Sequence, residues 1–239
     1  TAIKTVCDAR TEWEPGSRTA YHALSAMLVA AEAVRRVAHG KPWAQICKER
    51  LFDPIGAKTL SFELPTEGTP FALTPHPAQK PESLRQAFAS VVGHPAGGCC
   101  GTPGDAIKVL QLHTGWGTWG KNRLLYKKSL IEMHSIQYER EIERAVQSGK
   151  APTHEPWGLG ILLRGKGNKT GGHDWFGMGE QSSPTVFGHA GIDTVIGVAD
   201  IMNGNVLFFA STDSPNPQGQ TVYLRNGVTN RVFAVLKSL

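Results

Sequence analysis

The chain has 239 residues, of which 40% are hydrophobic and 19% are charged, and this composition is that of a folded globular protein rather than a disordered or fibrous one. Its 25 basic residues exceed its 20 acidic residues by five but are scattered along the sequence, which argues against a nucleic-acid partner. The longest hydrophobic runs, at residues 26–31 and 206–210, are far shorter than the roughly 20 residues that cross a bilayer, so no membrane span is expected.

The four cysteines are too few for a disulfide framework in a chain of this length. The adjacent Cys99 and Cys100 are expected to be two small buried residues rather than a metal or redox site, and no cofactor is expected. Thr1 is not followed by a basic segment and an apolar segment, so no signal peptide is visible, which slightly favours a cytoplasmic location.

Helical periodicity dominates the first part of the chain. Apolar residues recur every three or four positions between Tyr21 and His39, and Gly40 ends the pattern. Pro42 opens a second predicted helix that runs to about Leu51. Further along, the sequence predicts a short strand at 59–64, a long surface loop at 65–81, and helices at 103–113 and 129–136.

The character of the sequence changes after Pro156. Short β-branched or aromatic runs at 157–163, 194–198 and 206–211 are typical of strands, and Asn203-Gly204 between the last two indicates a hairpin. Residues 221–239 predict a closing helix whose apolar face contains Val228, Val232, Val235 and Leu236. We therefore expect an α+β protein with a mainly helical region at 1–150 and an antiparallel sheet with a C-terminal helix at 151–239, both parts of one domain.

Several common catalytic signatures are absent from the sequence. It contains no Gly-x-Ser-x-Gly, no His-Glu-x-x-His and no Gly-x-x-x-x-Gly-Lys-Ser/Thr. These absences argue against an α/β-hydrolase, a zinc protease and a P-loop protein.

Four ordered segments carry a resemblance instead. They are residues 13–24 (WEPGSRTAYHAL), 40–56 (GKPWAQICKERLFDPIG), 96–105 (AGGCCGTPGD) and 187–191 (FGHAG). In this order they resemble serine hydrolases of the class C β-lactamase fold, in which a tyrosine motif comes first and a Lys/His-x-Gly triplet lies on a sheet strand. The resemblance implies a β-lactamase and penicillin-binding-protein-like fold that is incomplete at its N-terminus.

The resemblance also implies a site and a two-step acyl transfer. A serine attacks a carbonyl, and Tyr21 takes and returns its proton as general base. The family's candidates for the cation that lowers the pKa of the phenol are His189 and a lysine of the family's first motif. Ala190, Gly191 and Ile192 are expected to line the substrate site, with the N–H of Ile192 holding the oxyanion. His22 is expected there too, where it orients Tyr21 or packs rather than acting as a second base.

The Tyr-His-Ala form of the tyrosine motif resembles esterase A-type, or family VIII, carboxylesterases. Many β-lactamases have asparagine where this chain has Ala23, and alanine cannot hold a substrate amide through its side chain. A small-molecule ester is therefore preferred as substrate over an amide or a β-lactam.

The family's nucleophile lies in Ser-x-x-Lys, and no serine of this chain has lysine three residues later. The spacing occurs with threonine at Thr1 and Lys4, but only 16 residues separate Lys4 from Tyr21, so we interpret it as chance. Two interpretations follow. Either a segment outside these residues supplies the nucleophile, or the chain is a non-catalytic binding or scaffold protein. The first predicts a complementing N-terminal segment or a self-associating patch, and with it a homo-oligomer.

Overall fold

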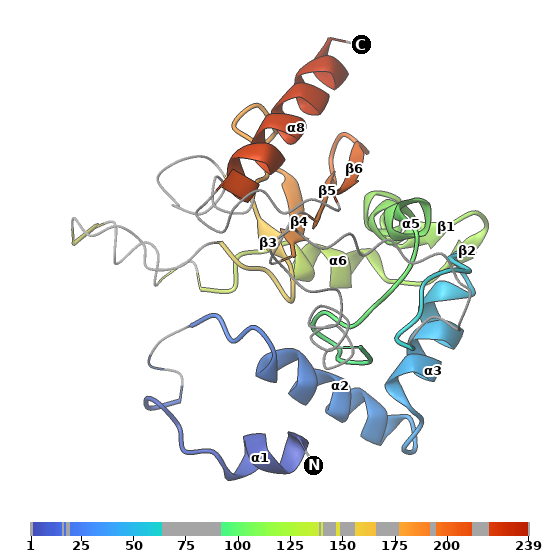
Figure 1. Cartoon of the computed structure of the whole chain (residues 1–239), viewed down its shortest axis with the longest axis vertical. Helices are drawn as coiled ribbons and strands as arrows, with labels where there is room; N and C mark the ends of the chain where they lie inside the picture. Colours follow the sequence, from blue (N-terminus) through green and yellow to red (C-terminus); the bar gives the residue numbers. More distant parts are fainter. Residues whose placement is uncertain are drawn as a thin grey trace, which may run out of the picture. The chain divides into compact units, whose positions relative to one another are not determined.

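The computed structural model describes residues 2–15, 17, 20–63, 92–138, 140, 147–148, 156–165, 177–191, 195–211 and 220–238 (Figure 1). The chain divides into two compact units. The helical unit comprises Thr1–Phe71 and Arg85–Gly101, and the sheet unit comprises Ala72–Leu84 and Thr102–Leu239. The expected division at residue 150 remains a prediction.

The described residues of the helical unit form four short helical segments: α1 (Ala2–Asp8), α2 (Ser25–Val37), α3 (Trp43–Cys47) and the π-helical turn η1 (Lys48–Phe52). Its buried residues come mainly from α3, η1 and the turn after them: Ile46, Cys47, Phe52, Ile55 and Ala57. The ring of Phe62 stacks on Phe52 and meets Trp43 edge to face, so aromatic packing joins residue 62 to this small core.

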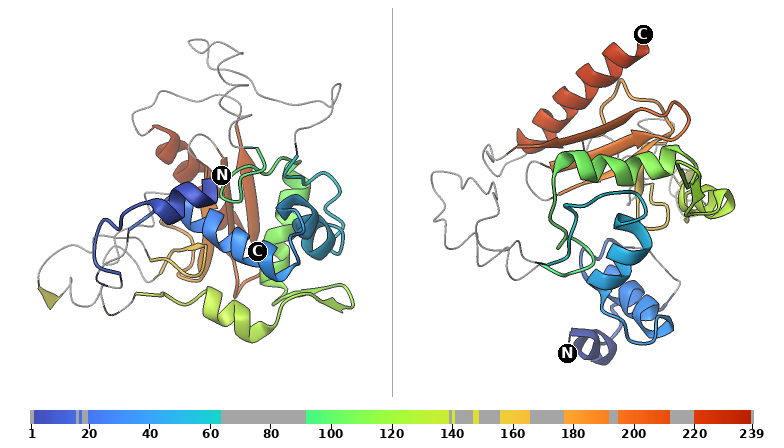
Figure 2. Two further views of the ribbon diagram at one scale, coloured as in Figure 1. Left: turned by 90° about the horizontal axis from the view of Figure 1, so that it is seen from below. Right: turned by 90° about the vertical axis from the view of Figure 1, so that its right-hand side faces the viewer.

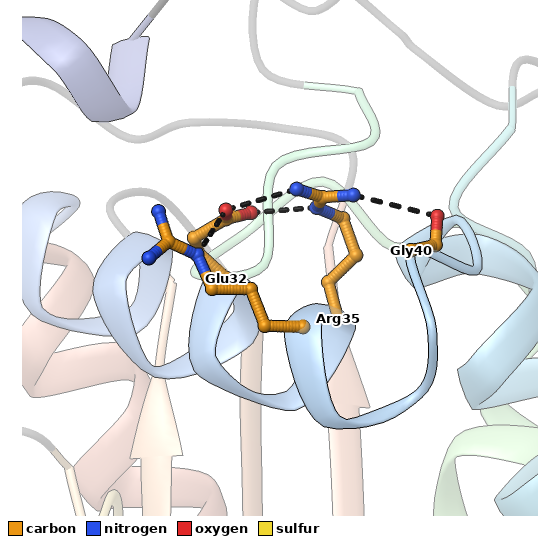
Figure 3. A network of polar contacts seen from close by, with 4 residues as sticks. Glu32, Arg35 and Gly40 are labelled. Atoms are coloured by element: carbon orange, nitrogen blue, oxygen red, sulfur yellow. Dashed lines mark hydrogen bonds and ion pairs between the residues drawn. The ribbon is translucent and has the colours of Figure 1, made fainter.

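Helix α2 confirms the helix expected from the periodic pattern, although it begins four residues after Tyr21. A polar network secures its C-terminal end (Figure 3). Arg35 binds both carboxylate oxygens of Glu32, at 2.6 and 2.9 Å, and Arg36 Nε lies 2.8 Å from Oε1. The chain then leaves the helix through Gly40, whose φ of 79° suits a residue without a Cβ.

The sheet unit has a four-stranded antiparallel sheet in the order β3–β4–β5–β6. The strands are β3 (Leu162–Leu163), β4 (Val186–Ala190), β5 (Val195–Asp200) and β6 (Val206–Ala210). Helices α5 (Pro103–Thr114), α6 (Lys127–Met133) and α8 (Gln220–Lys237) accompany it in the described part of the unit. A small hairpin, β1 (Thr118–Trp119) with β2 (Asn122–Arg123), lies between α5 and α6 in the chain.

The sheet separates two apolar clusters. On the α8 side, Phe233 and Met178 pack with residues of β3, β4 and β5, namely Leu162, Val186, Ala190, Ile196 and Val198. Leu207 and Phe209 of β6 pack against the same cluster. On the α5 side, Leu110 packs with Leu163, Phe187, Ala199 and Ile201. Figure 2 shows α5 and α8 covering opposite faces of the sheet. Because successive side chains of a strand point to opposite faces of the sheet, β4 and β5 contribute residues to both clusters.

Most expected elements of the sheet unit are confirmed, with the strand expected at 157–163 reduced to β3 and a bridge between Trp157 and Leu162. The face expected for the closing helix is confirmed in part. Val228, Val232 and Leu236 are half-buried, but Val235 is 59% exposed. The buried residues among 224–237 are Arg225, Thr229 and Phe233. The strand expected at 59–64 is reduced to one bridge between Ser61 and Cys100 among the residues described there. The loop expected at 65–81 lies outside the described residues.

Polar contacts explain the face that α8 buries. Thr229 Oγ1 donates to the carbonyl of Gly177 at 2.7 Å, and the amide oxygens of Asn226 and Asn230 accept from the N–H groups of Gly179 and Gln181. A search for apolar periodicity cannot identify the buried face of a helix when that face is held by hydrogen bonds to loop backbone.

Candidate active site

Tyr21 and His22 lie in the turn immediately before α2, in the helical unit. Tyr21 is 53% exposed, so its phenol is open to solvent at least in part. The His22 ring lies edge to face on Trp13, with ring centroids 5.7 Å apart, and its Nδ1 is 3.2 Å from Ser25 Oγ. His22 is thus anchored to the first turn of α2, in keeping with the expectation that it packs or orients its neighbour.

His189, Ala190 and Gly191 lie at the end of β4 in the sheet unit. Gly188, just before them, permits close pairing with β5, because a Cβ there would overlap the carbonyl oxygen of Gly197. The strand pairs His189 with Gly197, so no side chain of β5 stands directly opposite the imidazole. The sequence prediction that this triplet lies on a sheet strand is confirmed, while Ile192 lies outside the described residues.

The surroundings of His189 favour its neutral form. Its Nδ1 lies 2.6 Å from the carbonyl oxygen of Ala190, which can only accept, so Nδ1 carries the proton and Nε2 holds the lone pair of the neutral ring. Burial lowers the pKa of His189 below its usual value; the Ala190 carbonyl raises it, and the positive charge of Arg225 lowers it further. The lowered pKa disfavours the cationic role expected for His189, and that role stays a prediction.

Tyr21 and His189 belong to different units, and each is described within its own unit. Their meeting in one site stays a prediction, as do the roles of Ala190 and Gly191 in substrate binding.

A pair of histidines lies on the face of β4 that carries Phe187 and His189. His113 at the end of α5 and His134 just after α6 approach each other to 3.1 Å between Nδ1 and Nε2. Both rings contact Phe187, which shares a sheet face with His189. Burial lowers the pKa of each to about 4, and the charge of His113 adds to the effect on His134. This pair is neutral at pH 7, and both of its rings pack against the ring of Phe187.

The cysteines provide no activated nucleophile among the described residues. Desolvation raises the thiol pKa of Cys47 to about 12 and that of Cys99 to about 11. Cys100 is buried, whereas Cys99 is exposed, so the expectation of two buried residues holds for one of them. A thiol with a raised pKa is a poor nucleophile at neutral pH.

Sequence reasoning missed Arg225, a buried residue of α8. Its Nη1 donates to the carbonyl oxygen of Gly191 at 2.9 Å, directly after the His189 triplet. A lone arginine in a predicted amphipathic helix gives no signal of such a role, because only the fold brings residue 225 to residue 191.

Within the described residues, no group of three or more His, Cys, Asp or Glu side chains is arranged to hold a metal ion. In the same part of the chain, none of the helices has the length and apolarity to cross a membrane.

The model of the beta-lactamase family matches residues 1–227, so the chain belongs to this family. It has the β-lactamase and penicillin-binding-protein-like fold, with an antiparallel sheet flanked by helices.

Solved structures with the same fold include three proteins of different kinds. A β-lactamase from Mycobacterium bovis is 18% identical, with a TM-score of 0.61 over 93% of this chain and 66% of that protein. A family VIII carboxylesterase is 21% identical, with a TM-score of 0.62 over 91% of this chain and 60% of that protein. Simvastatin synthase (LovD) from Aspergillus terreus is 16% identical, with a TM-score of 0.60 over 86% of this chain and 53% of that protein.

The chain spans less than two thirds of the length of these solved structures. A search of curated proteins finds no match to it.

Proposed function

We propose that the chain is the larger part of a serine hydrolase that cleaves carboxylic esters through an acyl-enzyme. The observation that carries this proposal is the family match over residues 1–227, within which the tyrosine motif at 13–24 and the triplet at 189–191 occur in the family's order. The carboxylesterase among the structural neighbours is consistent with an ester substrate.

In the proposed reaction, Tyr21 acts as the general base. Its phenolate accepts the proton of the attacking serine, a tetrahedral intermediate forms, and the same proton passes to the departing alcohol. Water then attacks the acyl-enzyme by the reverse proton route and releases the acid. The partial exposure of Tyr21 supports this assignment, because a base must reach a substrate.

The neutral state of His189 changes how Tyr21 is activated. A neutral imidazole with its lone pair on Nε2 accepts a hydrogen bond and adds no positive charge. A phenol titrates near ~10 in water, so its ionisation near pH 7 needs a cation. We assign that cation to the lysine of a Ser-x-x-Lys segment outside these 239 residues, which also supplies the nucleophile.

Ester is preferred to β-lactam because Ala23 offers no side-chain hydrogen bond to a substrate amide. The acyl group, the alcohol and the capacity to transfer acyl groups to an alcohol rather than to water are questions for substrate profiling.

The direct test is hydrolysis of a short-chain nitrophenyl ester by the full-length protein. We expect Tyr21→Phe to lower kcat by 10²-fold or more, which is the range for removing a general base. The matched control is Tyr126→Phe, which removes an exposed phenol on the sheet unit and should leave kcat unchanged. Equal turnover in Tyr21→Phe and wild type would remove Tyr21 as the base, and absence of any ester hydrolysis would favour a binding or scaffold protein.

A further inference from the structure

Arg225 is a buried arginine whose guanidinium reaches the end of the strand that carries His189. Its residue exposure is 5%, and its Nη1 donates to the Gly191 carbonyl oxygen at 2.9 Å. The N–H of Gly191 is held as well, since it donates to Val195 O at 2.8 Å. Both polar groups of this residue are therefore fixed, one by β5 and one by α8.

The Gly191 carbonyl is the last described backbone group before Ile192, whose N–H is the expected oxyanion donor and lies outside the described residues. A hydrogen bond from a charged donor is stronger than a neutral one. Arg225 therefore anchors the backbone at the end of β4, two residues after His189.

The same guanidinium acts on His189 through its charge. Arg225 lies close enough to oppose protonation of the imidazole. Several described neighbours of His189 are uncharged at neutral pH. Gly197 stands opposite on β5, the Trp157 ring lies 5.4 Å away between centroids, and the His113 and His134 pair sits under Phe187 on the same face of β4.

We propose that Arg225 is a positioning residue of the active site, which fixes the backbone at the end of β4, next to His189. This inference rests on the proposed ester hydrolysis for its kinetic consequence but not for its effect on His189. Arg225 does not itself contact the reacting atoms in this proposal.

The chain offers a matched control in Arg164, a second buried arginine of the sheet unit. Its Nη2 donates to the carbonyl of Glu180 at 2.9 Å and its Nε to that of Gly179 at 3.3 Å. It thus holds backbone carbonyls as Arg225 does, but at the segment before β4 rather than after it.

The test compares Arg225→Gln with Arg164→Gln in the full-length protein, with the pKa of His189 followed by NMR and its signal assigned by its loss in His189→Gln. We expect the pKa of His189 to rise in Arg225→Gln and to stay at the wild-type value in Arg164→Gln. We also expect kcat to fall about tenfold in Arg225→Gln with KM within twofold, because a misplaced donor costs transition-state stabilisation.

Arg225→Lys keeps the positive charge but lacks the planar guanidinium with its several donors. It is the variant to measure if Arg225→Gln does not fold. We expect a wild-type pKa of His189 and a smaller loss of kcat. An unchanged kcat in every folded Arg225 variant, or a pKa of His189 that moves equally in Arg164→Gln, overturns the proposal. If wild type hydrolyses no ester while the pKa shift is found only in Arg225→Gln, the proposed function fails and the electrostatic role of Arg225 stands.

Discussion

The helical unit and the sheet unit place their apolar residues very differently. In α2 only Ala31 of the periodic apolar positions is buried, and Val37 at its end is 79% exposed. In the sheet, Phe187 is 1% exposed and lies between two histidine rings. The same kind of sequence pattern therefore leads to burial in one unit and to an open surface in the other, and only the sheet unit has a large core among the described residues.

The largest effect expected of a single substitution is on the core of the sheet unit. Phe187→Ala removes a fully buried ring and leaves a cavity, so we expect it to lower the free energy of unfolding by about 3–5 kcal/mol. Urea denaturation followed by fluorescence measures the change. Val37→Ala is the counterpart in the helical unit and should change stability by less than about 0.5 kcal/mol. Similar costs for the two variants would contradict the contrast between the units.

The next effect concerns the hairpin between β5 and β6. Asp200 is 1% exposed and accepts hydrogen bonds from Ser183, Thr185 and Asn203 and from the N–H of Met202. Asp200→Ala removes the shared buried acceptor of these donors, of which Ser183 and Thr185 are half-buried, so we expect a loss of about 1–3 kcal/mol in the free energy of unfolding. Glu132→Gln, on the exposed side of α6, is the control. A loss no larger than that of the control would show that the network does not stabilise the hairpin.

Acid should weaken the sheet unit through the His113 and His134 pair. Each has a folded pKa of about 4 against an unfolded value near ~6.5, so the unfolded chain binds more protons between these values. The contribution of the pair to stability is full above the unfolded pKa and falls as the pH drops from about 6.5 toward 4, by roughly 3 kcal/mol for each histidine at about 1.4 kcal/mol per pKa unit. Thermal unfolding across this range measures the slope, and the double variant His113→Gln/His134→Gln should flatten it. A slope that survives in the folded double variant would assign the acid sensitivity to other groups.

Asp200 affects stability in a lower pH range than the His113 and His134 pair. Burial raises its pKa, but the hydrogen bonds from Ser183, Thr185 and Asn203 outweigh this and lower it overall. Its contribution is present above the usual carboxyl pKa and is lost as the pH falls below it. The two windows can therefore be separated in one pH series.

The smallest effect is expected at the surface network of α2. The two arginines lower the pKa of Glu32 to about 2, but both are substantially exposed. Exposed ion pairs contribute little and are screened by salt. Glu32→Gln should shift the unfolding midpoint only slightly at low salt and not at all in 1 M salt. A large shift that persists at high salt would mean that α2 depends on this network.

The sequence predicts the elements of the sheet unit better than their packing. Apolar alternation and the Asn203-Gly204 turn locate the last two strands, because both are local signals. The polar part of the buried face of α8 was missed because Arg225 and Thr229 are held by the backbone of distant loops. Such contacts follow from the fold and leave no periodic pattern.

The sequence likewise predicts one part of the candidate site and misses another. The triplet at His189 was placed on a strand by its resemblance to a family motif, and the structure confirms the strand. The charge state of His189 was not predictable, since it depends on the Ala190 carbonyl and on Arg225. The role of Tyr21 remains a prediction that rests on its motif.

The most direct test of the account is a crystal structure of the full-length protein with its serine acylated by an ester-derived inhibitor. We expect the hydroxyl of Tyr21 within about 3 Å of the acylated serine oxygen, and Nε2 of a neutral His189 as a hydrogen-bond acceptor on the same side of the adduct. An acylated serine with Tyr21 beyond hydrogen-bond reach would contradict the account.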